Sequence, residues 1–406
     1  MSDKRAANVA VLVAALGYFV DIYDLILFSV VRVKSLIAIG VPEDQLLDAG
    51  VNLLSLQMFG MLVGGILWGV LGDRRGRLSV LFGSILMYSL ANIANAMVTS
   101  VGMYGAFRFI AGVGLAGELG AGITLVSEVL KKEHRGYGTT IVASIGVMGA
   151  VAAGLVADAF DWRVAYIVGG VMGLALLVLR VSVRESHMFQ AAKTTEISRG
   201  NFLSLFRPPA RGIRYLAVIL VAILIWYVIG ILITFSPEFA KEMSLPYTPS
   251  AGLAVLWTYS GLVLGDLASG VLSQLIRSRK KAIGLFLLLT VVGCAGYFLK
   301  VAPTLTMFYG FCVFLGFTIG YWAVFVTMAA EQFGTNLRAT ATTTAPNFVR
   351  GAVVPMTWGF QWFRDGAGLG VVGGGIAVGV IVLVLAVISL LGLSETYGKD
   401  LDYVEE

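Results

Sequence analysis

The chain has 406 residues, of which 58% are hydrophobic and only 13% are charged, and its formal net charge is +5. A soluble domain carries about twice that fraction of charged residues, so the composition excludes an ordinary soluble protein and indicates a membrane protein. The two cysteines, Cys294 and Cys312, lie in apolar stretches and predict no disulfide framework. Membrane topology explains the excess of basic residues, and no nucleic-acid partner is predicted.

Apolar stretches of about 20 residues recur along the whole chain, and each is long enough to cross a bilayer as a helix. A spanning segment must satisfy its own backbone hydrogen bonds, and the alternation of a transmembrane barrel is absent, so we predict an all-α membrane protein. The first stretch follows MSDKRAANVA without a small-residue cleavage site, and we interpret it as a span rather than a signal peptide. The twelve predicted spans are residues 8–31, 50–71, 78–98, 102–127, 138–157, 162–182, 214–235, 250–275, 282–300, 304–328, 339–362 and 369–393.

The basic residues predict the orientation of these spans. Twelve spans place both termini on one side of the membrane. With both termini inside, the inner segments hold about 21 of the 29 Lys and Arg residues and the outer segments about six, among them Arg32 and Lys34. Because cytoplasmic loops carry the excess of basic residues, we predict an N-in, C-in topology.

The chain divides into two similar halves. Glu128 and Arg135 recur 203 residues later as Glu331 and Arg338. Parallel six-helix repeats of this kind are a known transporter architecture. The predicted parts are an N-terminal six-helix half (1–182), a cytoplasmic linker (183–213), a C-terminal six-helix half (214–393) and a cytoplasmic tail (394–406).

Segment 69–77 reads GVLGDRRGR and resembles the G-x-x-x-D-R-x-G-R signature between spans two and three of the major facilitator superfamily. With the twelve spans and the half-chain repeat, the resemblance covers essentially the whole chain. It implies that charges at the inner helix ends pair across helices and hold one access state. The predicted gating residues are Asp73, Arg74, Arg77, Glu128, Arg135, Glu331 and Arg338, together with Asp266 of span eight.

Finer motifs resemble the metabolite:proton and aromatic-acid:proton symporters and the sugar porters. Segment 108–114, RFIAGVG, is similar to their R-F-x-x-G-x-G in span four, and segment 17–24, GYFVDIYD, is similar to the acidic span-one motif of the proton symporters. The paired glutamine of sugar porters is absent from span seven. Segment 234–239, TFSPEF, is closer to the organic-acid symporters, so we favour organic acids over sugars.

Two acids lie near the middle of the first span. Asp21 and Asp24 are three residues apart and therefore on one helix face. A charge inside the membrane is costly and marks a pathway or relay. Two nearby carboxylates in a low-dielectric site resist double ionisation, so one should hold a proton near neutral pH. The resemblance implies that Asp24 takes part in proton coupling, and the alternative for both acids is a permanent basic partner.

Further polar residues inside the spans predict a substrate site. Arg350 lies mid-span beside Asn347, and its guanidinium can bind a carboxylate bidentately or pair permanently with a span-one acid. In span four, Arg108 is predicted to bind substrate or to pair with a span-one acid, and Glu118 is predicted to be a second proton site. The aromatic residues predicted to line the cavity, with ordinary packing as the alternative, are Tyr18, Tyr23, Trp226 and Tyr227.

The sequence therefore predicts a secondary active transporter that couples protons to a small organic anion by alternating access. The alternatives are a sugar or polyol carrier, an exporter of an amphipathic compound or, more remotely, a non-transporting membrane sensor. No nucleophile, phosphate loop or metal cluster accompanies the two histidines, His134 and His187, so neither enzyme activity nor a cofactor is predicted. The predicted partners are protons, a small-molecule substrate and the lipid bilayer, for a monomer in a bacterial inner membrane.

Overall fold

The computed structural model describes residues 3–75, 77–117, 135–184, 202–399 and 405, and all regular secondary structure in these ranges is helical. The first helices are α1 (Asp3–Ala38), α2 (Leu46–Arg75), α3 (Arg77–Asn95), α4 (Val101–Leu115), α6 (Arg135–Ala159) and α7 (Trp162–Arg184). The later helices are α8 (Pro209–Tyr227), α9 (Ser236–Glu242), α10 (Ala251–Leu275), α11 (Arg279–Phe298), α12 (Leu305–Thr318), α13 (Trp322–Glu331), α14 (Thr335–Gly351), α15 (Val353–Gln361) and α16 (Gly370–Gly392).

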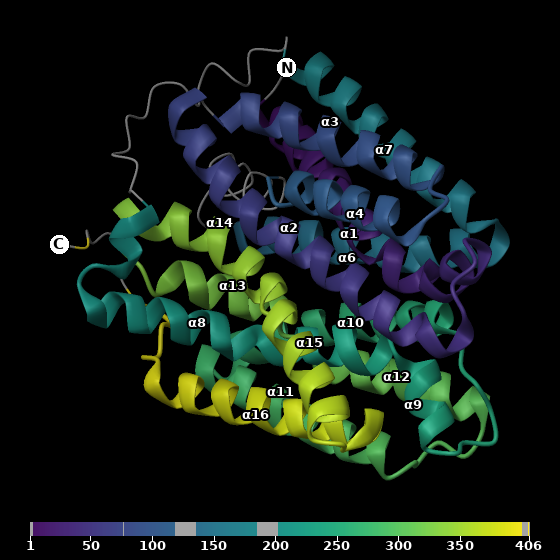
Figure 1. Cartoon of the computed structure of the whole chain (residues 1–406). Coiled ribbons are helices and arrows are strands. Elements are labelled where there is room, and N and C mark those ends of the chain that lie inside the picture. The colour runs from purple at the N-terminus through teal and green to yellow at the C-terminus, as the bar shows by residue number, and fades with distance from the viewer. Residues whose placement is uncertain (1–2, 76, 118–134, 185–201, 400–404, 406) are drawn as a thin grey trace.

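The helices form two bundles that pack side by side (Figure 1). Elements α1 to α7, here called the N-half, lie in the upper part of the view, and α8 to α16, the C-half, lie below them. Helix α6 packs against α10, and α2 packs against α14 and α15, so these helices form the seam between the halves. Helix α1 also contacts α10 across the seam, which places the span-one acids near the centre of the molecule.

The two halves repeat one close helix contact. A Cβ on Gly64 of α2 would lie 2.3 Å from the Val113 carbonyl oxygen of α4, and a Cβ on Gly265 of α10 would lie 2.2 Å from the Phe317 carbonyl oxygen of α12. Small residues let helix backbones approach closely inside a membrane. Glycine is therefore required at the same crossing in each half.

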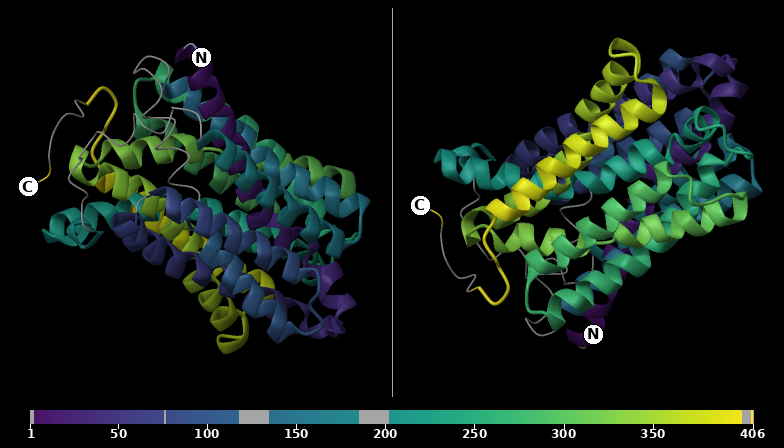
Figure 2. Two further views of the ribbon diagram at one scale, coloured as in Figure 1. Left: turned by 90° about the horizontal axis from the view of Figure 1, so that it is seen from above. Right: turned by 90° about the horizontal axis from the view of Figure 1, so that it is seen from below.

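Large apolar side chains cover the outside of the bundles. Leu275 is 76% exposed and Leu391 is 73% exposed, and α16 lies on the surface of the C-half, as the view from below shows (Figure 2). Eight helical segments of the described residues are long and apolar enough to cross a membrane. Such a surface suits lipid rather than water. The predicted all-α membrane fold is confirmed, while the count of twelve spans and the orientation stay predictions.

Several spans differ from their predicted course. Helix α1 continues to Ala38, so Arg32 lies within the helix and not in an outer loop. The predicted tenth span is interrupted between α12 and α13, and the seventh ends in a π-helical turn, Val228–Ile233. Broken helices are tolerated at membrane depth where they are buried in protein. The described part of the predicted linker holds a short 3₁₀ helix, Phe202–Phe206, and the start of α8.

Candidate functional site

Helix α1 brings two fully buried acids to different basic residues. Asp21 Oδ2 lies 3.7 Å from Nη1 of Arg350 on α14. The basic group that acts on Asp24 is Arg108 on α4. The two acids still repel each other, but each has its own guanidinium, so they belong to two clusters rather than to a single acid pair.

The Asp21–Arg350 cluster joins the two halves. The Arg350 guanidinium lies 5.8 Å from the ring centroid of Trp322. Within the described residues, Nε and Nη1 of Arg350 have no hydrogen-bond partner. Asn347, one turn earlier on α14, donates from Nδ2 to the Ala116 carbonyl oxygen of the N-half at 3.0 Å. A buried guanidinium with free donors beside an aromatic ring can bind a planar carboxylate.

The Asp24–Arg108 cluster lies within the N-half. Arg108 donates from Nη2 to Asn92 Oδ1 at 2.6 Å and from Nη1 to Gln57 Oε1 at 3.4 Å. Its guanidinium also lies 4.9 Å from the ring centroid of Tyr166. Asn92 and Arg108 both act on the Asp24 carboxylate. Asp24 is thus surrounded by a buried cation and a buried amide, although neither of its carboxylate oxygens has a hydrogen-bond partner among the described residues.

Sequence reasoning missed three residues of this second cluster. Gln57 and Asn92 are uncharged polar residues within apolar spans, and both are fully buried. Extending the search from charged to amide side chains inside spans would have found them. Gly169 of α7 is the third, because a Cβ there would lie 2.2 Å from Asp24 Oδ1. Only the tertiary contact identifies Gly169, since the chain has 50 glycines.

The aromatic residues predicted to line a cavity lie in three places. Tyr18 is within electrostatic reach of Asp21 and Arg350 and belongs to that cluster. Tyr23 instead donates its hydroxyl to the Ala165 carbonyl oxygen of α7 at 2.9 Å. Tyr227 donates to the Gly375 carbonyl oxygen of α16 at 2.7 Å, which turns it away from Arg350. Trp226 is buried in α8.

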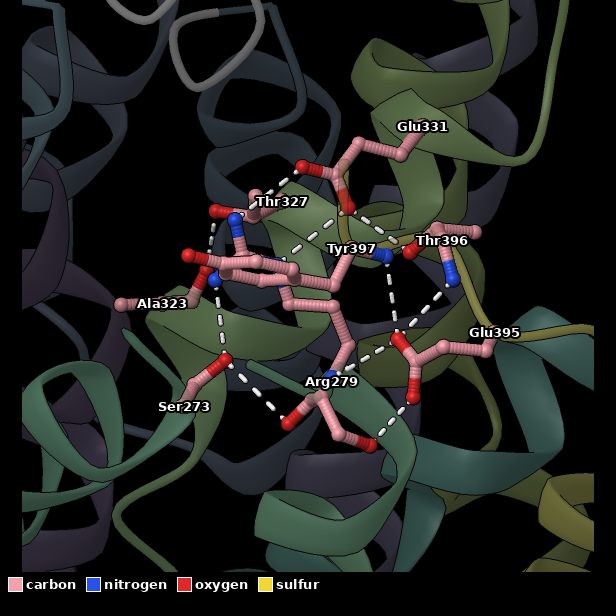
Figure 3. A network of polar contacts seen from close by, with 9 residues as sticks. Ser273, Arg279, Ala323, Thr327, Glu331, Glu395, Thr396 and Tyr397 are labelled. Carbon is pink, nitrogen blue, oxygen red and sulfur yellow. Dashed lines mark hydrogen bonds and ion pairs between the residues drawn. The ribbon is translucent and has the colours of Figure 1, made fainter. Parts of the chain in front are cut away.

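The predicted gating residue Glu331 belongs to a network on one end of the C-half (Figure 3). Arg279 lies 3.2 Å from Glu331, and Thr396 donates its hydroxyl to the same carboxylate at 2.7 Å. Arg338 donates to the Ala330 carbonyl oxygen at 3.1 Å. Figure 3 also shows Glu395, which receives the backbone amides of Arg279 and Thr396, each at 2.9 Å.

Glu395 follows the last helix and lies beyond the spans. Burial opposes ionisation of its carboxyl group, but hydrogen bonds from the Ser278 hydroxyl and three backbone amides outweigh burial and lower its pKa from 4.5 to about 2. The network therefore contains an ionised Glu395 at neutral pH. For the other predicted gating residues, the structure gives only the position in a helix: Asp73 and Arg74 lie in the last turn of α2, Arg77 begins α3 and Arg135 begins α6. Glu118 and Glu128 lie outside the described residues.

Asp266 does not form an ion pair with any described residue. Its Oδ1 accepts the backbone amide of Ala323 at 3.2 Å, and the amide of Trp322 also points to the carboxylate. Asp266 therefore caps α13, the second piece of the interrupted tenth span, within the C-half. The contact between helices that the structure shows for Asp266 is this cap, and its predicted role as a latch stays a prediction.

Two ion pairs join the halves at the end predicted to face outside. Arg32 of α1 binds both carboxylate oxygens of Glu238 on α9, at 2.6 Å and 2.8 Å. Arg32 is fully buried, and its guanidinium lies 4.7 Å from the ring centroid of Phe235. The second pair is between Arg364 and Asp48. These contacts join the halves at this end of the seam, and sequence reasoning had assigned Arg32 only to an outer segment.

Two bundles of membrane-length helices, with opposite charges buried at their seam, define a multi-pass membrane transporter. The sequence profile described as Major Facilitator Superfamily matches residues 14–353. The chain therefore belongs to the major facilitator superfamily. The members it resembles are transporters of small molecules and not enzymes, as predicted.

Three bacterial relatives and one solved structure resemble the chain over most of its length. The gentisate transporter of Corynebacterium glutamicum is 27% identical over 98% of this chain and 90% of its own. The niacin transporter of Acinetobacter baylyi is 27% identical over 71% and 72%, and the cis,cis-muconate transport protein of that species is 24% identical over 96% and 94%. The structure of the proton:xylose symporter XylE bound to 6-bromo-6-deoxy-D-glucose superposes with a TM-score of 0.72 at 16% identity, covering 98% of both chains, and this likeness concerns the fold.

Proposed function

We propose that the protein is a proton-coupled symporter of a small organic anion that carries a carboxylate. The observation that supports this proposal is the buried Arg350 at the seam, whose guanidinium faces Asp21 at 3.7 Å and retains unpaired donors within the described residues. A carboxylate substrate satisfies those donors, because a guanidinium binds a carboxylate through two parallel hydrogen bonds. The names of the gentisate, niacin and muconate transporters agree with an acidic substrate.

Substrate binding at Arg350 competes with Asp21. The arginine holds one carboxylate well, so an arriving substrate weakens the bond between the halves that Asp21 provides. Asp21 then needs a proton, since an ionised carboxylate without a partner is costly inside the membrane. Asp24 and Arg108 give the N-half its own acid, and we place proton coupling on the two aspartates.

Alternating access then consists of rocking the N-half (1–182) against the C-half (214–393) about this central site. With the proposed N-in, C-in topology, the Arg32–Glu238 pair holds the outer end closed. Protons on the aspartates and the substrate on Arg350 bias the equilibrium between the two access states, because each binds one arrangement of the seam better than the other.

Uptake into proteoliposomes with an imposed pH gradient tests the function. Radiolabelled gentisate, nicotinate and muconate serve as carboxylates and xylose as the neutral comparison. We expect a carboxylate to accumulate only when the outside is acidic, and Asp24→Asn to reduce the response to the gradient. The matched control is Asp365→Asn, since Asp365 is 61% exposed and touches neither cluster. Uptake of xylose alone, or an Asp24→Asn protein with an undiminished gradient response, contradicts the proposal.

A further inference from the structure

The buried charges of the described residues do not balance. Eight charged side chains are buried in the described ranges, and three of them, Arg32, Arg211 and Arg279, pair with glutamates near the bundle ends. The five that remain in the interior are Asp21, Asp24, Asp266, Arg108 and Arg350. Three carboxylates thus face two guanidiniums. Among the described residues, the interior therefore holds one more carboxylate than guanidinium before any anion enters.

Asp266 is the interior acid that has no basic partner among the described residues. It is 5% exposed, and within the described residues its Oδ2 has no hydrogen-bond partner. Its Oδ1 already accepts the amide of Ala323. A proton can therefore sit on Oδ2 without breaking the cap of α13. An ionised carboxylate with one orphaned oxygen is costly to bury, whereas a neutral carboxyl group is not.

Among the described residues, no cation forms an ion pair with Asp266 that could replace this proton. From α1 it faces Tyr18, which also senses Asp21 and Arg350, and from α13 it faces backbone amides. Arg279, the first residue of α11, is already bound to Glu331. The other titratable side chains on the described parts of elements packed against α10 are Asp21, Tyr23, Asp24, Arg32 and Lys34 of α1, Asp158 of α6, Lys280, Lys281, Cys294 and Tyr297 of α11, Tyr309 and Cys312 of α12, Glu331 of α13, and Glu238, Lys241 and Glu242 of α9.

We propose that Asp266 is a second proton-binding site, in the C-half, and that each monovalent carboxylate is carried together with two protons. The inference rests on the proposed function. A monovalent anion on Arg350 raises the excess in the interior from one negative charge to two, and an uncompensated charge at this depth is strongly unfavourable. Two protons restore neutrality: one on the aspartates of α1 and one on Asp266. Transport then moves one net positive charge per substrate.

The two-proton cycle has a quantitative signature. With two protons per monovalent anion, one unit of pH gradient raises the accumulation ratio about a hundredfold, and about 59 mV of inside-negative potential raises it about tenfold. With one proton, the pH gradient gives about tenfold and the potential has no effect. Potassium gradients with valinomycin set the potential in proteoliposomes, and the pH gradient is set independently.

The deciding variant is Asp266→Asn. Its amide oxygen can still accept the Ala323 amide and cap α13, but it cannot release a proton. We expect this variant to keep its response to the pH gradient, reduced to about tenfold per unit, and to lose its response to potential. Asp266→Glu should keep both wild-type responses. Asp365→Asn is the matched control, since this carboxylate is 61% exposed and belongs to neither buried cluster, and it should leave both responses intact.

The outcomes separate the two proposals. Wild-type uptake that follows the pH gradient but ignores potential overturns the second site and leaves the proton-coupled symporter standing. An Asp266→Asn protein that still responds to potential also overturns it, as does loss of that response in Asp365→Asn. Carboxylate uptake indifferent to the pH gradient refutes the proposed function itself. If Asp266→Asn does not fold, the wild-type stoichiometry still decides.

Discussion

Removing Glu238 should open the outer end of the transporter. The Arg32 guanidinium makes two hydrogen bonds to this carboxylate and one to the Thr234 carbonyl oxygen at 3.1 Å, all across the seam. Glu238→Gln leaves Arg32 buried without a counter-charge in the closed arrangement, whereas water can solvate the guanidinium once the seam opens. The variant therefore destabilises the closed state selectively.

The size of this effect follows from the burial of the pair. Breaking a buried ion pair by removing one partner costs about 3–5 kcal/mol. The side chain of Glu238 is 17% exposed, so part of this cost is screened, and we take about 2 kcal/mol. Since about 1.4 kcal/mol changes an equilibrium constant tenfold, the open population should rise roughly 30-fold.

A cysteine at the seam reports this change. Ser55 is buried at the seam, where its hydroxyl lies 2.7 Å from that of Thr357. Ser55→Cys, with Cys294 and Cys312 replaced by alanine, is labelled in intact cells with a membrane-impermeant maleimide. Glu238→Gln should raise the labelling rate at least tenfold. Asp365→Asn, which removes a carboxylate within the C-half at the same end, should not change it. A rate within twofold of the parent in Glu238→Gln refutes the gate.

Three further predictions concern the interior and the inner network. Gly169→Ala places a methyl group 2.2 Å from Asp24 Oδ1 and should reduce gradient-driven uptake at least tenfold. The control is Gly270→Ala, whose added Cβ has no atom within 4 Å and which should leave uptake unchanged. Equal uptake by the two variants would show that close packing of Gly169 against Asp24 is not needed for transport. Arg350→Lys keeps the charge but loses the bidentate geometry, so KM for the carboxylate should rise at least tenfold, and an unaltered KM would remove Arg350 from the substrate site. Because the pKa of Glu395 is lowered from 4.5 to about 2, this group stabilises the fold above pH 4.5, and its contribution disappears as the pH falls towards 2. Glu395→Gln should therefore lower Tm at pH 7 but not near pH 2. An equal decrease in Tm at both pH values would exclude the charge of Glu395 as the cause.

The predicted fold class and family needed little beyond local patterns. Apolar length, the basic-residue distribution and the GVLGDRRGR segment each depend on neighbours in sequence, so they indicate a membrane transporter of the major facilitator superfamily directly. The charges inside the spans could also be located, because burying a charge in lipid is costly enough that each one marks a function or a partner.

The sequence did not determine which acidic residue pairs with which basic residue. Asp21 and Asp24 lie on one helix face, so helical periodicity alone predicts that they form a pair. In the structure they lie about one turn apart along α1, and Asp21 is next to Arg350 of α14 while Asp24 is next to Arg108 of α4. Arg32 binds Glu238, which lies 206 residues further along the chain, and no local sequence pattern predicts a contact over that distance. The seam decides these contacts, since two packed halves bring together side chains from opposite ends of the chain. The identity of the predicted acids came from the sequence. Only the tertiary structure showed their division into two sites, the lack of an ion-pair partner for Asp266 among the described residues and the ion pairs that join the halves at one end of the seam.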